Sequence, residues 1–289
     1  MPTITQAITE GAQRLQAAGV DRERLTAGVL LGHVLDLDRT QLLTRSEQQV
    51  EQTRHNHYLA LIERRAHGEP LQYLTGHQEF YGLDFIVTPD VLIPRPETEF
   101  LIERVLKAVA ELKQDSPLIV DVGTGSGCIA VTLAKQLPGA RLIATDVSSA
   151  ALAVARTNAE RHRMLARIQF LEGDLLAPLA KRGVDGCVDL VVSNPPYVTE
   201  DCREVLQREV RDWEPGAALF GGADGMAFYR RLLADTPQIL KLDGYVVLEI
   251  GFSQIDSISE MVKDSAFRLL DITRDLQNIP RTLCLRRTV

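Results

Sequence analysis

The sequence predicts an α/β fold, in which a small all-α domain precedes a doubly wound, mostly parallel sheet. From about residue 117, short β-branched runs alternate with helical segments, the pattern of a parallel sheet covered by helices on both faces. Residues 1–75 instead carry apolar residues at helical spacing. A glycine-rich loop, DVGTGSG at 121–127, follows the first β-branched run. Together these observations set the order of the domains.

The composition matches that of soluble globular proteins, with 45% hydrophobic and 25% charged residues among 289. A net charge of −7 argues against a protein that wraps a nucleic-acid backbone, so we expect no direct nucleic-acid partner. The four cysteines and six histidines show no ligand spacing, which predicts reduced thiols and no metal. No signal peptide is recognisable, and no apolar run approaches the roughly 20 residues of a membrane span. We therefore expect a cytoplasmic protein without a membrane partner. We also expect a monomer, although the sequence itself carries no signal for the oligomeric state.

Residues 1–75 form the predicted helical domain. Apolar residues recur from Ile4 at helical spacing and stop at Gly19. Asp21 is suited to cap a second helix. Ser46 and Gln49 resemble a capping box that begins a third. The expected apolar face of the second helix includes Leu25, Val29 and Leu30.

Residues 76–100 form a predicted connector. "HQEFYGLDFIVT" alternates apolar and polar residues around Tyr81-Gly82, which is typical of a β-hairpin. "IPRPETE" at 93–99 is a stiff turn, because Pro94 and Pro96 each fix φ. For Arg95 in this linker, the spacing favours a structural salt bridge.

Residues 101–289 form the predicted sheet domain. Helical segments at 128–136 and 149–162 separate β-branched runs that each lead into a loop. The runs are "PLIVDVG", "ARLIATDV", "IQFLEGD", "DLVVSNPP" and "GYVVLEIG", with "FRLLDITRD" and "RTLCLRR" as further strands.

The glycine loop differs from the loops that bind dinucleotides. Gly123, Gly125 and Gly127 let the chain turn tightly and approach a ligand, but Cys128 stands where a dinucleotide fingerprint has its last glycine. The GK[ST] of a phosphate-binding loop is also missing. Taken alone, such glycines could simply form a tight strand-to-helix turn.

Carboxylates at the ends of successive strands favour a cationic ligand over a pyrophosphate. Asp121 precedes the loop, Asp146 ends the second strand and Asp174 ends the third. Asp146 stands about 20 residues after the glycine loop, a position at which a carboxylate can accept both ribose hydroxyls. S-adenosylmethionine has a positive sulfonium, two free ribose hydroxyls and no phosphate. It is therefore the predicted cofactor, and NAD is the competitor.

"VVSNPPYV" at 191–198 indicates a substrate site. Pro195 and Pro196 remove backbone donors and end the strand rigidly. If this fourth strand neighbours the first, Asn194 faces the donor at the switch point of the sheet. The Asn194 side-chain oxygen and the Pro195 carbonyl can then accept the two N–H groups of an amide or aromatic amine, and Tyr197 can stack on it. The alternative is an ordinary turn with a buried tyrosine.

DxGxGxG followed by NPPY resembles the class I S-adenosylmethionine-dependent amino-methyltransferases, which have a Rossmann-like fold. Within them, the chain is most similar to the release factor glutamine methyltransferase family (PrmC/HemK). The resemblance extends over almost the whole chain, through "GEPLQYLTG" at 68–76, "LIPRPETE" at 92–99, "SNPPYV" at 193–198, "EP…AL…G..DG" at 214–225 and "LEIG" at 248–251.

The resemblance implies methylation of N5 of the glutamine in the Gly-Gly-Gln motif of peptide-chain release factors. It implies that the helical domain grips the release factor. It assigns Asn194, Pro195, Pro196 and Tyr197 to the glutamine, with Asn194 also near the donor. Many members have an aromatic residue beside the adenine where this chain has Leu175. The implied donor residues are Gly123, Thr124, Gly125, Ser126, Gly127 and Asp146, with the loop after Asp174 beside the adenine.

Three alternatives remain open. NPPY supports an adenine-N6 methyltransferase equally well, but no basic, aromatic-rich insertion could accept a flipped base. The paralogous enzyme that methylates a glutamine of a ribosomal protein is the second, and the PRPETE form of the linker favours release factors. A binding module that only retains the donor pocket is the third, and the intact Asn194, Pro195 and Tyr197 argue against it.

Overall fold

The computed structural model describes residues 1–180 and 182–289, which form two compact units. The smaller unit comprises Met1–His77 together with Leu206–Trp213, and the larger comprises Gln78–Val205 and Glu214–Val289. Most of the predicted connector, 76–100, therefore belongs to the larger unit. No helix within the described residues has the length and apolar character needed to cross a membrane.

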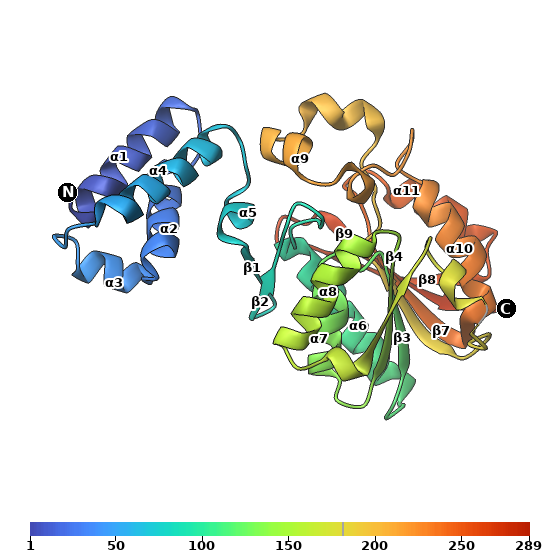
Figure 1. The fold of residues 1–289 in the computed structure, drawn as a ribbon. Helices are drawn as coiled ribbons and strands as arrows, with labels where there is room; N and C mark the ends of the chain where they lie inside the picture. Colours follow the sequence, from blue (N-terminus) through green and yellow to red (C-terminus); the bar gives the residue numbers. More distant parts are fainter. Residues whose placement is uncertain (181) are drawn as a thin grey trace. The chain divides into compact units, whose positions relative to one another are not determined.

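The smaller unit is a helical bundle whose core lies between α1, α2 and α4 (Figure 1). At its centre the hydroxyl of the fully buried Tyr58 donates to the carbonyl of Ala7 at 3.2 Å. Gly11 lets α1 approach this ring closely. The helices are α1 (Ile4–Ala17), α2 (Glu23–Leu35), α3 (Arg39–Thr44), α4 (Gln52–Ala66), α5 (Leu71–Thr75) and α9 (Arg208–Trp213).

The helix starts predicted at Asp21 and at Ser46 and Gln49 were wrong. Arg22 is the N-cap of α2 and Glu51 that of α4, and neither makes a side-chain cap bond. Both residues instead contact the start of α1. The Ser46 carbonyl accepts the amide of Thr5, and Gln49 forms an isolated antiparallel β-bridge with Thr3. Capping boxes occur where they were not expected, at Thr3 with Gln6 and at Asp38 with Gln41.

The predicted apolar face of the second helix was also partly wrong. Leu30 is fully buried, whereas Leu25 and Val29 retain 48% and 40% of their accessible surface. The buried side of α2 turns through Ala27, Leu30 and Leu31 toward α1 and α4, so the other two apolar residues remain at the surface.

The larger unit contains the predicted doubly wound, mostly parallel sheet, with strand order β5-β4-β3-β6-β7-β9-β8. The pairs from β5 to β7 are parallel, and β9 is antiparallel to both β7 and β8. The strands are β3 (Leu118–Val122), β4 (Arg141–Asp146), β5 (Ile168–Glu172), β6 (Val188–Ser193), β7 (Leu240–Glu249), β8 (Phe267–Arg274) and β9 (Pro280–Arg287).

Alternate residues of the central strands face two separate cores. In β6, Leu190 and Val192 join the core under the helices α6, α7 and α8, and Val191 joins the core under α10 and α11 (Figure 1). Burying one such side chain contributes about 1.5–3 kcal/mol. The helices are α6 (Glu99–Leu112), α7 (Cys128–Gln136), α8 (Ser149–Arg161), α10 (Ala227–Ile239) and α11 (Ile255–Lys263).

The predicted hairpin is confirmed and leads into a short 3-10 turn. Its strands are β1 (His77–Phe80) and β2 (Leu83–Ile86), and Tyr81 and Gly82 at the turn both have positive φ, as a tight hairpin requires. η1 (Pro96–Thr98) then leads into α6. The other 3-10 turns are η2 (Leu165–Arg167), η3 (Ala177–Leu179), η4 (Glu200–Val205) and η5 (Gly216–Ala218).

Gly11→Ala is expected to lower the free energy of unfolding of the helical unit by about 1–3 kcal/mol, as overpacking does. The new Cβ would lie 1.9 Å from the Tyr58 hydroxyl. Gly28→Ala in α2 is the matched control, because nothing lies within 4 Å of its Cβ, and it is expected to stabilise by roughly 0.4–1 kcal/mol. Urea unfolding followed through Trp213, the single tryptophan, reports on this unit. Equal effects would contradict the proposed clash.

Candidate functional site

Two loops distant in sequence leave the sheet side by side. β3 and β6 pair in parallel with Val122 opposite Ser193, and the Ser193 hydroxyl donates to the Val122 carbonyl at 2.6 Å. The glycine loop follows β3 and Asn194 follows β6. The predicted adjacency of these strands is therefore confirmed. Because β4 and β6 flank β3, this is the switch point at which ligands of such sheets bind.

The glycines keep the loop open above the end of β3. Gly123, Gly125 and Gly127 have φ of 72°, 54° and 80°, values that glycine adopts without strain. A Cβ at Gly123 or Gly125 would meet nothing within 4 Å. At Gly127 it would lie 3.0 Å from the Ala155 side chain, where α7 passes α8. The first two glycines thus serve the backbone turn and leave room for a ligand, and the third serves helix packing.

Asp121 presents an unsatisfied carboxylate oxygen beneath this loop. The side chain is fully buried, and its Oδ2 accepts the Thr124 hydroxyl at 2.6 Å. Its Oδ1 has no hydrogen-bond partner among the residues that the structure describes. Burial, with a smaller contribution from the nearby Asp146, raises the pKa of Asp121 to about 7, although hydrogen bonds from the Thr124 hydroxyl and the Ala130 amide lower it. A buried acceptor without a partner is costly, so the position is suited to a cationic or N–H-bearing ligand.

Asp146 is held firmly at the end of β4. Its Oδ2 accepts the Gly125 amide at 2.8 Å, and its Oδ1 accepts the Ser148 amide at 2.9 Å. Each carboxylate oxygen keeps a second lone pair, so both can still accept a hydroxyl. The side chain is partly exposed. These contacts join Asp146 to the glycine loop and leave it able to bind a ribose.

No hydrogen bond or ion pair among the described residues joins Asp174 or Leu175 to this group. Asp174 is exposed and forms an ion pair with Arg231 of α10, at 2.5 Å. Leu175 has a φ of 48° and packs against the core under α10 and α11. An aliphatic surface therefore follows β5, where many relatives were expected to carry an aromatic ring.

Asn158 of α8 connects the glycine loop to the hairpin. The side chain is fully buried. Its oxygen accepts the Ile86 amide at 2.7 Å, and its nitrogen donates to the carbonyls of Ile86 and Ser126 at 2.9 and 2.8 Å. All of its hydrogen-bonding groups are therefore occupied by the backbone of two other segments.

The NPPY turn leaves two oxygen acceptors available. Asn194 uses its nitrogen, which donates to the Thr98 hydroxyl at 3.2 Å. Within the described chain, no hydrogen bond ends on the Asn194 Oδ1 or on the Pro195 carbonyl. The half-buried Tyr197 packs against the core, and its carbonyl accepts the Gln254 side chain at 3.1 Å. Burial raises the pKa of Tyr197 well above its ordinary value, so its ring stays neutral.

Sequence reasoning missed two buried polar residues behind Asn194. The Thr98 hydroxyl donates to Oε2 of Glu249 at 2.6 Å, and both side chains are buried. Burial raises the pKa of Glu249 to about 7. Both residues stand in segments already singled out, "LIPRPETE" and "LEIG", but local spacing gave no sign that the two segments meet.

Arg95 stabilises the linker, as its spacing favoured. Its guanidinium forms an ion pair with the buried carboxylate of Glu214, whose second oxygen accepts the Ile93 amide at 3.2 Å. Glu214 belongs to the "EP" motif at 214 and 215. The contact fastens the stiff turn to a segment more than a hundred residues away.

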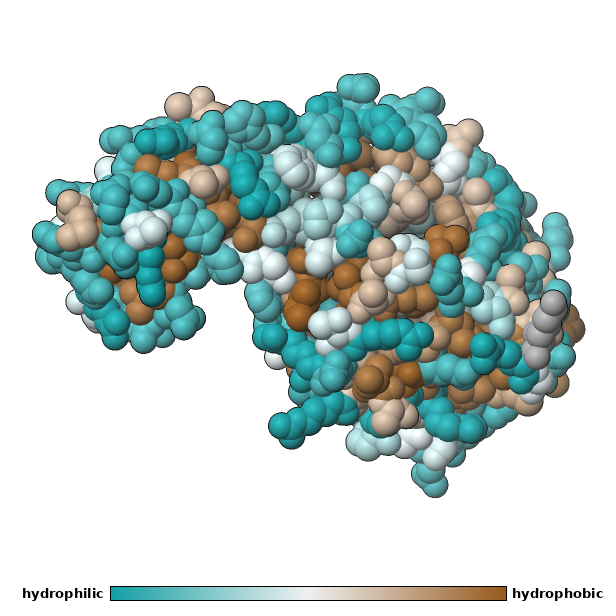
Figure 2. Space-filling view, viewed as in Figure 1, coloured by the Kyte–Doolittle hydropathy of each residue, from teal (hydrophilic) through white to brown (hydrophobic). Residues whose placement is uncertain are grey.

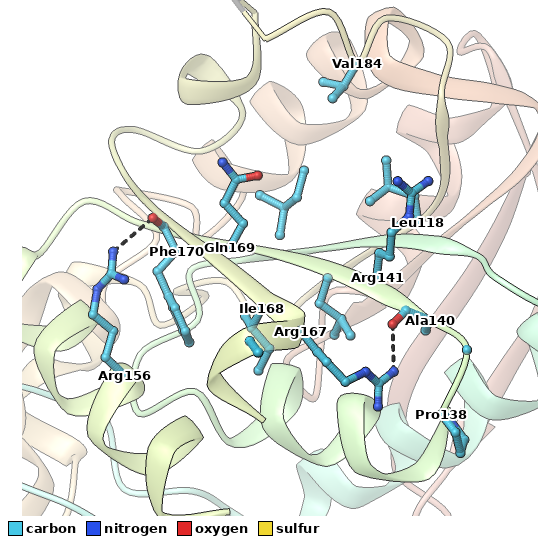
Figure 3. A pocket seen from close by; sticks show the side chains of 14 residues that line it. Leu118, Pro138, Ala140, Arg141, Arg156, Arg167, Ile168, Gln169, Phe170 and Val184 are labelled. Atoms are coloured by element: carbon cyan, nitrogen blue, oxygen red, sulfur yellow. Dashed lines mark hydrogen bonds between the residues drawn. The ribbon is translucent and has the colours of Figure 1, made fainter. Parts of the chain in front are cut away.

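A groove of about 720 Å³ lies at the other end of the strands and contains none of the predicted site residues. It is lined by the first residues of β3, β4 and β5 (Figure 3). Two of its arginines are already engaged, because Arg156 donates to the Phe170 carbonyl and Arg167 to the Ala140 carbonyl. Across residues 1–180 and 182–289, no cluster of three or more His, Cys, Asp or Glu side chains is arranged to hold a metal.

The helical unit has an apolar groove of about 480 Å³. Leu25, Val29 and Leu43 line it, and Leu43 retains 70% of its accessible surface. Arg24 and Arg39 also line it, and neither forms an ion pair within the described residues. Apolar side chains reach the surface of this unit among hydrophilic ones (Figure 2).

Comparisons with known proteins agree with both units. Residues 6–76 match the PrmC N-terminal domain, and residues 96–211 match the Methyltransferase small domain. A release factor glutamine methyltransferase of Koribacter versatilis is 43% identical over 286 residues, 99% of each chain. One of Moorella thermoacetica is 46% identical over 261 residues, 90% of each chain. A methyltransferase crystal structure from Pyrococcus furiosus shares the fold, with a TM-score of 0.52 and 19% identity over 81% of this chain and 100% of that one.

Proposed function

Because the chain belongs to the release factor glutamine methyltransferase family, we propose that it transfers a methyl group from S-adenosylmethionine to N5 of the glutamine in the Gly-Gly-Gln motif of peptide-chain release factors. The chain is a protein-glutamine methyltransferase. One observation carries the finer proposal: β3 and β6 pair in parallel, which brings Asn194 beside the glycine loop. A release-factor substrate would place the reaction in the cytoplasm.

The residues around the glycine loop suit this donor. The free oxygen of Asp121 would attract its positive charge, Asp146 would accept the ribose hydroxyls, and the open space at Gly123 and Gly125 would admit it. Leu175 would offer the adenine an aliphatic contact. When bound, the donor supplies a methyl group on a positive sulfur that is open to in-line displacement.

The NPPY turn would position the nucleophile. An amide nitrogen is a poor nucleophile because its lone pair is delocalised. The Asn194 Oδ1 and the Pro195 carbonyl would accept its two N–H groups and help the nitrogen become pyramidal, while Tyr197 would pack on the planar amide. Holding the nitrogen in line supplies much of the catalysis. The methylated nitrogen is acidic and releases its proton readily, so this mechanism requires no strong general base.

Labelled donor offered separately with release factor, ribosomal protein and DNA tests the proposed substrate. We expect label on the release factor, and none when its Gly-Gly-Gln glutamine is changed to alanine. Label only on the ribosomal protein would assign the paralogous activity, and label only on DNA would assign adenine methylation. Either outcome would overturn the proposal.

Donor affinity is expected to rise with pH through about 7, because Asp121 titrates there. Below that pH the carboxyl is neutral and loses its attraction for the positive donor. Affinity should fall by up to about tenfold per pH unit on the acid side. Calorimetry at pH 6, 7 and 8 measures this effect. Asp121→Asn should abolish the slope, whereas Asp174→Asn, at an exposed ion pair, should keep it; a slope that persists in Asp121→Asn would rule out the assignment.

Asn194→Ala is expected to lower kcat by about 10²–10³-fold, a loss comparable to that from removing one hydrogen-bond donor of an oxyanion hole. Donor affinity should change little, because the Asn194 oxygen acts on the nucleophile. Single-turnover methylation gives the rate, and calorimetry gives the donor Kd. Asn56→Ala, on an exposed part of α4, serves as the control. Small and equal losses in rate and donor affinity would contradict the role.

We propose that the apolar groove of the helical unit binds the release factor. Leu25, Val29 and Leu43 would take an apolar segment, and the unpaired Arg24 and Arg39 would favour one flanked by carboxylates. Such a groove, apolar at the centre and charged at its rim, is typical of protein interfaces.

Leu43→Asp is expected to raise KM for the release factor about tenfold, equivalent to about 1.4 kcal/mol. The carboxylate would place a charge in the groove without disturbing the core, because Leu43 is largely exposed. Leu276→Asp, which is 98% exposed in the other unit, controls for an added charge. Steady-state kinetics with varied release factor provide the measurement. The same KM in both variants would refute the assignment.

A further inference from the structure

The hydrogen bonds behind Asn194 fix which end of its amide faces outward. The Thr98 hydroxyl has one proton, and it is donated to Oε2 of Glu249 at 2.6 Å. Only lone pairs of Thr98 then remain for Asn194. The Asn194 amide must therefore turn its nitrogen toward Thr98, as it does at 3.2 Å, and its oxygen away.

We infer that Thr98 and Glu249 are positioning residues that orient the Asn194 amide so that its oxygen, and not its NH2 group, meets the substrate. The inference rests on the proposed function and deepens it. An outward oxygen accepts an N–H of glutamine, whereas an outward NH2 would oppose the NH2 of the substrate. The same oxygen repels a carboxylate, so the orientation also separates glutamine from glutamate.

The two positioning residues are held rigidly. Thr98 and Glu249 each retain only 2% of their accessible surface. Thr98 lies in η1 between the prolines of the stiff turn and α6, and Glu249 is the last residue of β7. The Tyr229 hydroxyl donates to the Glu249 carbonyl at 2.9 Å and fixes the end of that strand. The Asn194 nitrogen therefore meets an acceptor that has little freedom to move.

Protonation of Glu249 would release the proton of Thr98 toward Asn194 and permit the opposite orientation. Burial, with a smaller contribution from Glu97, raises the pKa of Glu249 to about 7, although Thr98, Arg281 and Tyr197 act to lower it. The carboxylate is ionised above that pH, so the productive orientation is favoured on the alkaline side. The titratable and charged groups that face Glu249 are Glu97 from η1, Cys128 from α7, Tyr197 after β6, Tyr229 from α10 and Arg281 from β9.

The experiment compares Thr98→Val, which keeps the shape and loses the hydroxyl, with Thr98→Ser, which keeps the hydroxyl. We expect Thr98→Val to lower kcat by about 10²-fold, as misplacement of a positioned group does, with unchanged donor Kd. Thr98→Ser should retain most of the activity. A release factor whose Gly-Gly-Gln glutamine is replaced by glutamate should inhibit the Thr98→Val enzyme better, relative to its KM, than it inhibits the wild type.

The pH dependence of kcat at saturating donor gives a second readout. We expect the wild type to gain activity through pH about 7, and Glu249→Gln, which cannot titrate, to lose that inflection. If Thr98→Val does not fold, the comparison of the pH profiles of the wild type and Glu249→Gln tests the inference on its own. An inflection that persists in Glu249→Gln would overturn the inference, as would wild-type kcat in Thr98→Val. A Thr98→Val loss shared by donor affinity and melting temperature, with unchanged glutamate inhibition, would also overturn it.

A wild type that is inactive on the release factor would overturn the proposed function and this inference with it. A wild type that is active, alongside an equally active Thr98→Val variant, would overturn the inference alone.

Discussion

The parallel pairing of β3 with β6 is the contact on which the candidate site depends. It sets Val122 opposite Ser193 and so makes two loops, some seventy residues apart in the chain, emerge together. The pairing is buried on both faces, between the cores under α6–α8 and under α10–α11. A shift of register by one residue would move every side chain of β6 to the wrong core, so the alignment of the loops is as secure as the sheet itself.

The fold could be predicted from the sequence because its signals are local. Runs such as "LIVDV" and "LVVS" fill strands buried on both faces, and the glycine loop marks the turn that follows the first of them. The adjacency of the first and fourth strands followed from the topology of such sheets. The starts of the helices were harder to predict. Ser46 and Gln49 have the local pattern of a capping box, but in the folded chain they contact Thr5 and Thr3 instead.

The residues of the candidate site could likewise be predicted only in part. Asp121, Asp146 and Asn194 could be singled out because each stands at or next to the carboxyl end of a strand of the predicted sheet. The contact between Thr98 and Glu249 could not, because 151 positions separate them and neither has a distinctive local pattern. Nor does the sequence show that Asp174 pairs with Arg231. Such contacts depend on how η1 and α10 lie over the sheet, which only the folded chain defines.

Asn158 gives the connector and the glycine loop a common anchor. One amide group replaces a strand partner for Ile86 and, at the same time, holds the carbonyl of Ser126. Neither aspartate nor glutamine could serve both, since aspartate lacks the N–H donors and glutamine is longer by a methylene. The hairpin is therefore more than a spacer between the units: its path fixes one wall of the loop that the donor would occupy, and selection on the connector would also act on the loop.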